Sequence, residues 1–525
     1  MKYITFIPLI GGMAVANAKA VGHKPEFVLS YGAFAKNESN LKAYWPDVEW
    51  HLLDAETNDL VEEDFNPDYS DIDFVSAVCP CAGMSGLNCS NRSADNATNN
   101  WLYKSAEYIL GTIKPKVYFG ENAPGLYSEQ NVKVLNKLRE YGKQYGYSFT
   151  IYKTDTYRHG IPQHRMRTFY FFWKGEYCPQ MDWYNHPSEL PFEKWILDKN
   201  VGTDDLPNKF TTHEMYPEMQ WIMETRCDND YAKYVQLFYD QYENVSESIR
   251  TPYDFIDHHD LWQEYRDWLV NHPNKDKPIN GNGNRTPMYY IDYRWGKVKN
   301  GLGYFATQPI VYKDAANAII SKNMQWTLHP IENRYLNSRE IMAMMGLPSD
   351  FKLVTNNLQQ VTQNVPVCTA QDMTEQVIKF INGELPMTQY NFIKQNNLQQ
   401  KVDQVDVKDV SLFEDMDEDE IENPFDDPEF TKDFWSIYDK IKDKTQGFGA
   451  AGSWKSDTLQ SYIYEQKMKG KSNLSVVRSG RKIAREMYEE EQRRQAEIEK
   501  EMEPEGYYGN NTDFEIDGDE DLFDL

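Results

Sequence analysis

Cysteine is scarce in this sequence, with six residues among 525. That number is too small for a disulfide framework, and the scatter of the residues favours a reducing compartment. Cys79, Cys81 and Cys89 lie near one another, but their spacing is not Cys-x-x-Cys and no histidine lies close by in the sequence. We therefore predict no metal site.

Positive charge is also scarce. Lysine and arginine number 55 against 82 acidic residues, a net charge of −27. Residues 401–525 hold 34 acidic and 17 basic residues, so −17 of this charge lies there and −10 in the first 400. Since no basic block indicates broad phosphate binding, any contact with nucleic acid must be local and shape-specific. We expect residues 389–525, which begin with a Gln/Asn-rich hinge at 389–404, to be an acidic, partly helical or disordered extension with a potential protein partner.

The amino terminus allows two interpretations. Residues 1–20 resemble a secretory signal, with Lys2, an apolar run and Ala16-Asn17-Ala18 as a cleavage-like site. The same residues also fit a strand at 3–8, a glycine turn and a helix from Met13. The regular pattern downstream favours the second interpretation, a cytoplasmic protein and no membrane association.

Short apolar runs alternate with helical patterns through residues 1–174. We expect strands at 3–8, 26–31, 48–53, 72–77, 116–121, 148–153 and 168–173, with helices from residue 13, at 101–112 and at 129–144. This alternation predicts an α/β fold with a doubly wound, mostly parallel sheet. The length and the 40% hydrophobic content allow two or three domains.

Reactive side chains lie where three of these strands end or begin. Pro80-Cys81 follows the strand at 72–77 and places a thiol at the carboxyl end of the sheet, where ligands bind in open α/β folds. A thiolate is a strong carbon nucleophile. By itself a lone cysteine in an apolar setting is more often inert. The polar stretch at 90–100 fits either a lid over a substrate or a solvated linker.

Two further motifs follow at intervals of about forty residues. Glu121-Asn122 ends one strand, and Gln163-His164-Arg165-Met166-Arg167 leads into another. In order and spacing the three motifs resemble the cytosine-5 DNA methyltransferase family of bacterial or phage type. The resemblance implies a Rossmann-like fold with Cys81 as the nucleophile, Glu121 as the acid and Arg165 as the group that positions both Glu121 and the base. It also implies substrate-positioning roles for Asn122, Gln163 and Arg167.

Two further segments that resemble the family begin near residue 335. Residues 334–348 fit an N-capped helix that Gly346 ends, and Thr362-Gln363-Asn364-Val365-Pro366 precedes a helix at about 369–382. These segments imply that residues 331–388 complete the catalytic domain of 1–174. Residues 175–330 would then be an inserted target-recognition region. We expect that region to be irregular, because it shows no long amphipathic helix.

The same resemblance implies S-adenosylmethionine as the cofactor, but this sequence departs from the family pattern. Of Phe-x-Gly-x-Gly-Gly only Gly11 and Gly12 remain, with Leu9 at the first glycine. The strand at 26–31 lacks a terminal ribose-binding acid, and none follows until Glu38. Asp54 fits either an adenine-facing acid or an ordinary turn residue. The expected cofactor-binding residues are Ile7, Ile10, Gly11, Gly12, Asp54, Pro80, Gln363 and Asn364.

The implied function is methyl transfer to carbon 5 of a cytosine flipped out of double-stranded DNA, through a covalent Cys81 adduct, by a protein that acts as a monomer. Two alternatives stay open. One is an RNA cytosine-5 methyltransferase. The other is a non-catalytic nucleic-acid-binding relative, which the eroded glycine turn and the missing acid favour.

Overall fold

The computed structural model of the chain describes residues 1–80, 84, 97–128, 131–199, 216–276, 286–300, 309–320, 326–351, 353–354, 358–404 and 463. Two compact units divide the chain, Met1–Asp406 together with Leu525, and Val407–Asp524. All elements below belong to the first unit. The predictions for Cys81, for residues 85–96 and for the extension beyond residue 404 lie outside the described residues, apart from Ile463.

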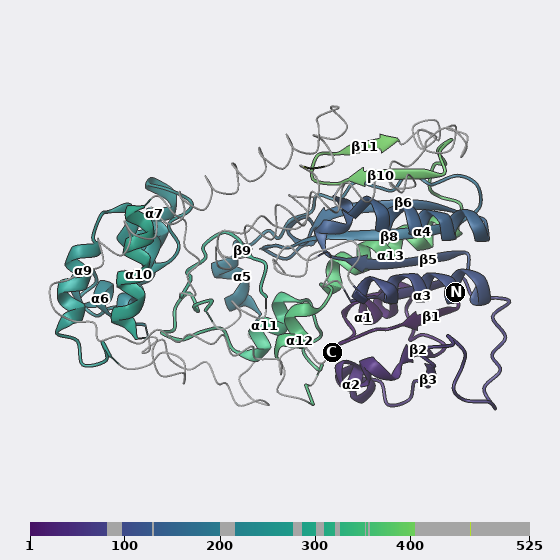
Figure 1. Ribbon diagram of the computed structural model, residues 1–525, viewed down its shortest axis with the longest axis horizontal. Helices are drawn as coiled ribbons and strands as arrows, with labels where there is room; N and C mark the ends of the chain where they lie inside the picture. The colour runs from purple at the N-terminus through teal and green to yellow at the C-terminus, as the bar shows by residue number, and fades with distance from the viewer. Residues whose placement is uncertain are drawn as a thin grey trace. The chain divides into compact units, whose positions relative to one another are not determined.

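A nine-stranded sheet forms the centre of the first unit, in the order β11-β10-β6-β8-β5-β4-β1-β2-β3 (Figure 1). Most neighbouring strands are parallel, but β8 is antiparallel to β5 and β6, and β11 is antiparallel to β10. The strands are β1 (Tyr3–Phe6), β2 (Val28–Tyr31), β3 (Trp50–Leu53), β4 (Phe74–Val78), β5 (Val117–Asn122), β6 (Tyr147–Asp155), β8 (Met166–Lys174), β10 (Phe392–Asn396) and β11 (Lys401–Gln404).

Helices cover both faces of the sheet because its buried strands are apolar on both sides. Successive side chains of a strand point to opposite faces. In β5, Phe119 packs in a core with α1 (Gly12–Val21) and α13 (Val367–Ile381). Its neighbour Tyr118 packs in a second core with α3 (Asn100–Tyr108) and α4 (Val132–Tyr145). This is the doubly wound α/β fold that the sequence predicts.

The strands and helices expected in residues 1–174 are present within a few residues of their predicted bounds. The amino terminus forms β1 and α1 in the core, as the preferred interpretation predicts. Helix α11 (Ser338–Met344) begins at Asn337, whose side chain accepts a hydrogen bond from the Glu340 amide in a capping box. None of the described helices combines the length and apolarity needed to cross a bilayer.

Between β8 and α11 the described residues include six α-helices, two of them 14 and 13 residues long, so the prediction of an irregular region without long helices is wrong. The helices are α5 (Phe192–Asp198), α6 (Pro217–Arg226), α7 (Tyr231–Asn244), α8 (Pro252–His258), α9 (Trp262–Val270) and α10 (Pro287–Lys299). Helices α6 to α10 share a core in which half of the buried residues are aromatic, including Trp221, Tyr234, Phe238 and Trp262, whereas α5 packs in the core that contains α1 and α13. Because the periodicity is carried by Tyr and Trp, which also occur on surfaces, the aliphatic pattern that marks a helix is absent.

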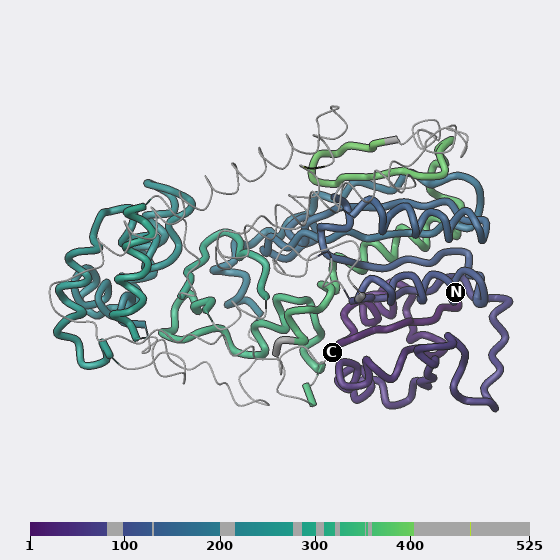
Figure 2. The backbone as a smooth tube through the Cα atoms, in the orientation of Figure 1, coloured from purple at the N-terminus to yellow at the C-terminus, as the bar shows by residue number. Residues whose placement is uncertain are grey.

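A second correction concerns the segment beyond residue 388, which the sequence suggested was a hinge. Strand β10 pairs in parallel with β6, and β11 pairs with β10, so the sheet continues to Gln404. Figure 2 shows this late segment running beside the strands from the middle of the chain. Gln395, Asn396 and Asn397 are buried with partners, whereas Gln389, Asn391, Gln399 and Gln400 are exposed. Asn397 Nδ2, for example, donates to Thr154 Oγ1 at 3.0 Å and to the Tyr184 carbonyl at 3.0 Å.

Candidate active site

The predicted nucleophile segment is flanked by residues that lie against β5. On one side Val78, the last residue of β4, is paired with Glu121 in the register of β4 and β5. On the other side is Met84. A Cβ added to Gly125, in the turn after β5, would lie 2.1 Å from the Met84 carbonyl oxygen. Both described flanks of residues 81–83 therefore contact the strand that carries Glu121, or the turn that follows it. Pro80 is partly buried at the end of β4.

Glu121 is buried and ion-paired. Its side chain lies at the end of β5, and Arg167 Nε in β8 is 2.6 Å from Glu121 Oε1. Burial raises the pKa of Glu121, and the charges of Arg167 and Arg165 oppose this shift without cancelling it. The carboxyl group therefore holds a proton to higher pH than an exposed glutamate. Such a group suits proton donation to a reacting ring.

Arg165 has a different position from the one predicted. It is buried, and its guanidinium donates to the carbonyls of Ile319 at 2.8 Å, Thr362 at 2.6 Å and Asn364 at 3.1 Å. These bonds tie the start of β8 to two distant segments, one of which carries the predicted cofactor motif. Arg167 forms the ion pair with Glu121, and the charge of Arg165 also acts on this carboxyl group.

The two predicted amides differ in their surroundings. Asn122 is buried, its Oδ1 accepts from the Ala123 amide at 2.9 Å, and its Nδ2 has no partner among the described residues. Gln163 lies in β7 (Gln163–His164), donates to the Met344 carbonyl at 3.0 Å and accepts from the Ile319 amide at 3.4 Å. Asn122 thus keeps a donor for a ligand, whereas Gln163 connects backbone segments.

The turn between β1 and α1 is built with left-handed residues. Gly11 has a φ of 109°, and Leu9, at the position of the family's first glycine, has a φ of 51°. Ile7 also has a positive φ, 44°, which is unusual for a β-branched residue. The altered sequence therefore keeps a strained turn at this place without the first glycine of the family pattern. Strain of this kind is typical of ligand sites.

Asn364 closes the amino terminus of α1. Its Oδ1 accepts a hydrogen bond from the Gly12 amide at 2.8 Å. A Cβ on Gly12 would lie 2.2 Å from the Val365 carbonyl oxygen, so only glycine fits there. The predicted residues from the two ends of the family resemblance, 352 positions apart in the sequence, thus meet in one place.

A cavity of about 10 Å³ lies at this meeting point. It is lined by Pro8, Leu9, Ile10, Asn37, Val78, Gln360, Gln363 and Asn364. Its wall includes Asn364 Nδ2, a buried donor with no described partner. A cofactor with a carboxylate, such as S-adenosylmethionine, suits the chemistry of this place. The turn, the amino terminus of α1 and the Asn364 donor all favour a negatively charged group. A volume of this size holds about one water molecule, so the lining side chains must move before such a cofactor enters.

Asp54 and Glu38, the two acids considered in the sequence, differ in their surroundings. Asp54 is exposed and accepts from the amides of Glu56 at 2.8 Å and Thr57 at 2.9 Å, as an ordinary turn residue does. Glu38 in α2 (Ala35–Tyr44) is buried, and the Ser30 hydroxyl donates to it at 2.5 Å. Burial raises the pKa of Glu38 to about 8. Polar α2 residues such as Asn37 and Glu38 were missed because polar helix positions usually face solvent.

Cys79 contrasts with the role predicted for Cys81. It is buried, its Sγ lies 3.5 Å from Ser105 Oγ, and the Tyr170 hydroxyl lies 3.8 Å from the sulfur. Burial raises the pKa of Cys79 to about 11, so its thiol stays protonated near neutral pH. Cys79 is a core residue.

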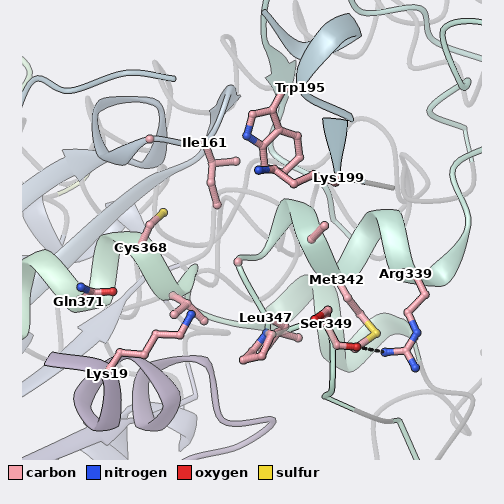
Figure 3. A pocket seen from close by; sticks show the side chains of 15 residues that line it. Lys19, Ile161, Trp195, Lys199, Arg339, Met342, Leu347, Ser349, Cys368 and Gln371 are labelled. Carbon is pink, nitrogen blue, oxygen red and sulfur yellow. Dashed lines mark hydrogen bonds between the residues drawn. The ribbon is translucent and has the colours of Figure 1, made fainter. Parts of the chain in front are cut away.

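A larger cavity, of about 350 Å³, lies away from Glu121 between α1, α5, α11 and α13. Figure 3 shows Trp195 of α5 and Lys199, which follows α5, on one wall, and Lys19 of α1 and Cys368 of α13 on others. None of the predicted catalytic or cofactor residues lines it. Its size alone therefore does not make it the active site.

A doubly wound sheet with a ligand turn after its first strand and a buried acid at its carboxyl edge defines an α/β enzyme of the nucleotide-cofactor type. The chain belongs to the C-5 cytosine-specific DNA methylase family, whose model matches residues 3–379. The resemblance found in the sequence is thereby confirmed.

Several relatives are named Type II methyltransferases. M1.HphI of Haemophilus parahaemolyticus is 21% identical over 396 residues, which cover 73% of this chain and 88% of that protein. M.Bpa9945I of Bacillus paralicheniformis is 23% identical over 59% of this chain and 71% of its own length. M.AgeI of Thalassovita gelatinovora is 31% identical over 128 residues, which cover 24% of this chain and 29% of that protein.

Among solved structures, the Spodoptera frugiperda DNMT2 mutant is 12% identical, with a TM-score of 0.38 over 72% of this chain and 100% of that one. The Entamoeba histolytica methyltransferase EhMeth is 11% identical, with a TM-score of 0.38 over 73% of this chain and 98% of that one.

Proposed function

We propose that the protein is a DNA (cytosine-5)-methyltransferase that uses S-adenosylmethionine and acts through Cys81. The observation that carries this proposal is the environment of Glu121. It is a buried acid with a raised pKa, ion-paired with Arg167 and paired in register with the strand that leads to Cys81. Family membership supplies the reaction class.

In the proposed reaction the Cys81 thiolate attacks carbon 6 of the flipped cytosine and forms a carbon–sulfur bond. Glu121 donates its proton toward ring nitrogen 3, so that the charge of the adduct is offset. S-adenosylmethionine, held by the turn after β1 and by Asn364, would supply an electrophilic methyl group to carbon 5, which has enamine character in the adduct. Loss of the carbon-5 proton, return of the nitrogen-3 proton to Glu121 and expulsion of Cys81 restore the aromatic ring.

Helix α10 offers a surface for contact with DNA. Tyr289 and Tyr293 are exposed, their rings stack with centroids 6.0 Å apart, and Lys297 Nζ lies 4.5 Å from the Tyr293 ring centroid. Stacked tyrosines beside a lysine suit contact with bases and phosphates. In a chain with net charge −27 such a local basic surface supports specific, limited contact.

The test is transfer of radiolabelled methyl groups to DNA and to RNA by the full chain. We expect transfer to DNA, complete loss in Cys81→Ser and little change in Cys79→Ala, because Cys79 is a buried thiol. Cys81→Ser should still bind DNA. Full activity of Cys81→Ser would refute the covalent mechanism, and transfer to RNA alone would identify the RNA enzyme instead.

A second candidate function is a nucleic-acid-binding relative that no longer uses the cofactor. The small cavity beside Asn364 favours it. Calorimetric titration with S-adenosylmethionine separates the two candidates. Binding with a stoichiometry near one supports the enzyme, and absence of binding together with retained DNA binding supports the relative.

A further inference from the structure

Two histidines and one aspartate from three separate segments meet outside the site described above. His159 Nδ1 lies 2.5 Å from Asp372 Oδ2, and His186 Nε2 lies 2.9 Å from the same oxygen. All three candidate ligand atoms lie within 4.8 Å of one another. His159 ends the turn η6 (Thr156–His159), His186 follows β8, and Asp372 lies in α13.

The cluster has the features of a partly enclosed metal site. The His159 side chain is inaccessible and that of Asp372 is 12% exposed, whereas that of His186 is 55% exposed and gives an ion a path from solvent. The other ring nitrogen of His159, Nε2, lies 2.7 Å from Thr154 Oγ1. A hydrogen bond at the far nitrogen is what orients and fixes the tautomer of a metal-bound histidine.

We propose that His159, His186 and Asp372 bind one divalent transition-metal ion of the zinc type, with solvent at the fourth position. Two imidazoles and one carboxylate are ligands that such ions accept in a tetrahedral arrangement. With ligand bonds of about 2.0–2.1 Å, neighbouring ligand atoms lie roughly 3.3 Å apart. The two nitrogen–oxygen separations must therefore open slightly, which rotation of the exposed His186 and of Asp372 allows.

A bound ion would act on structure rather than on the reaction. Residues 156–165 lead from β6 to Arg165, and α13 follows the Asn364 segment. The ion would join both to the segment after β8, so that three parts of the chain up to 213 residues apart are held together. The sequence gives no sign of this site because the three ligands are separated by 26 and 185 intervening residues.

The chain contains a matched control pair. His164 Nδ1 lies 2.9 Å from Asp155 Oδ2, and these side chains are 52% and 12% exposed, almost the same as His186 and Asp372. The control pair belongs to no cluster of three ligands among the described residues. His164→Ala thus removes an equivalent imidazole without touching the proposed site.

The experiment is titration of the untagged, metal-free full chain with Zn²⁺ by calorimetry and with Co²⁺ by visible absorption, for wild type, His186→Ala and His164→Ala. We expect one equivalent to bind wild type and His164→Ala, with the visible bands of tetrahedral cobalt. We expect His186→Ala to lose more affinity than the roughly 10- to 100-fold that follows when a metal ligand loses its hydrogen-bond partner. Thr154→Val should weaken binding by about 10-fold.

His186 is half exposed, so its alanine variant should fold, and circular dichroism checks this. The six cysteines are common to every variant, so the difference between the two histidine variants isolates the cluster. Three results would each overturn the proposal. They are an unchanged metal affinity in His186→Ala, a loss of affinity in His164→Ala equal to that in His186→Ala, and no metal binding by wild type.

Discussion

Arg167 Nε lies 2.6 Å from Glu121 Oε1 across the antiparallel pair β8 and β5, in a place that water hardly reaches. Two opposing effects act on the carboxyl group. Burial raises its pKa, and the guanidinium beside it limits the rise. Without the charge of Arg167, burial would therefore raise the pKa of Glu121 further.

Removing the guanidinium should shift the pH dependence of methyl transfer. In the proposed mechanism Glu121 acts in its protonated form, so activity falls as pH rises through its pKa. Arg167→Gln removes the main charge that lowers this pKa, and we expect the alkaline limb of the pH–rate profile to move to higher pH. Lys174→Gln, at the far end of β8, should leave the limb in place. An unshifted limb in Arg167→Gln would contradict the assignment.

Replacement of the acid itself should reduce turnover far more than binding. Glu121→Gln keeps the shape of the side chain but has no proton that it can give up. Since general acid catalysis contributes about 10²–10⁴-fold, we expect a loss of that order in kcat with DNA affinity preserved. Single-turnover methyl transfer and a DNA-binding titration measure the two effects separately. A variant with wild-type kcat would exclude Glu121 as the acid.

Arg165 should matter for stability and cofactor binding through the three carbonyls that it holds. Arg165→Met leaves the carbonyls of Ile319, Thr362 and Asn364 without their donors. We expect the free energy of unfolding to fall by about 2–4 kcal/mol, measured in urea, and S-adenosylmethionine binding to weaken. Arg167→Gln is the comparison and should lower the free energy of unfolding less, because the backbone carbonyl to which Arg167 donates is that of its neighbour Met166. Equal losses of unfolding free energy in the two variants would contradict the role of Arg165 in holding these three carbonyls.

The sequence predicted the fold well where local patterns decide it. Strand β5 and helix α13 show the expected apolar periodicity, and the Asn337 cap is visible in the letters. Strand β10 was not predicted because its segment is rich in Asn and Gln. These side chains become buried when the strand pairs with β6, which lies about 240 positions earlier in the sequence. The aromatic helices after β8 were missed for a different reason, since Tyr and Trp do not mark a buried face.

The sequence motifs predicted which residues belong to the site, but they did not predict which of these residues contact one another. Arg165 and Arg167 are two positions apart, and the arginine that meets Glu121 depends on the register of β8 against β5, which pairs Asn122 with Thr168. Register is a tertiary property that a single strand does not encode. The burial of Glu38 likewise depends on how α2 packs against β2.

Glu38 should make stability depend on pH. Its pKa is about 8 in the folded chain and 4.5 in an unperturbed glutamate, so the folded state binds the extra proton. Stability therefore falls as pH rises from about 4.5 to 8. Glu38→Gln imitates the protonated form and should match wild type near pH 5 but exceed its stability at pH 9. Urea unfolding of both proteins at these two pH values tests this. Parallel curves with no pH-dependent difference would mean that Glu38 is not buried.

Replacing Gly12 and replacing Gly296 by alanine should change the free energy of unfolding in opposite directions. A Cβ at Gly12 would lie 2.2 Å from the Val365 carbonyl and 2.3 Å from Asn364 Nδ2, so the 364–365 segment must move away from α1. We expect Gly12→Ala to lose about 1–3 kcal/mol of unfolding free energy. Gly296, inside α10, faces open space, and Gly296→Ala should gain about 0.5–1 kcal/mol because alanine loses less entropy in a helix. Chemical denaturation of both variants checks the pair. If Gly12→Ala were as stable as wild type, the Asn364 segment would not close the turn after β1 in solution, and the cofactor cavity would be wider than it is here.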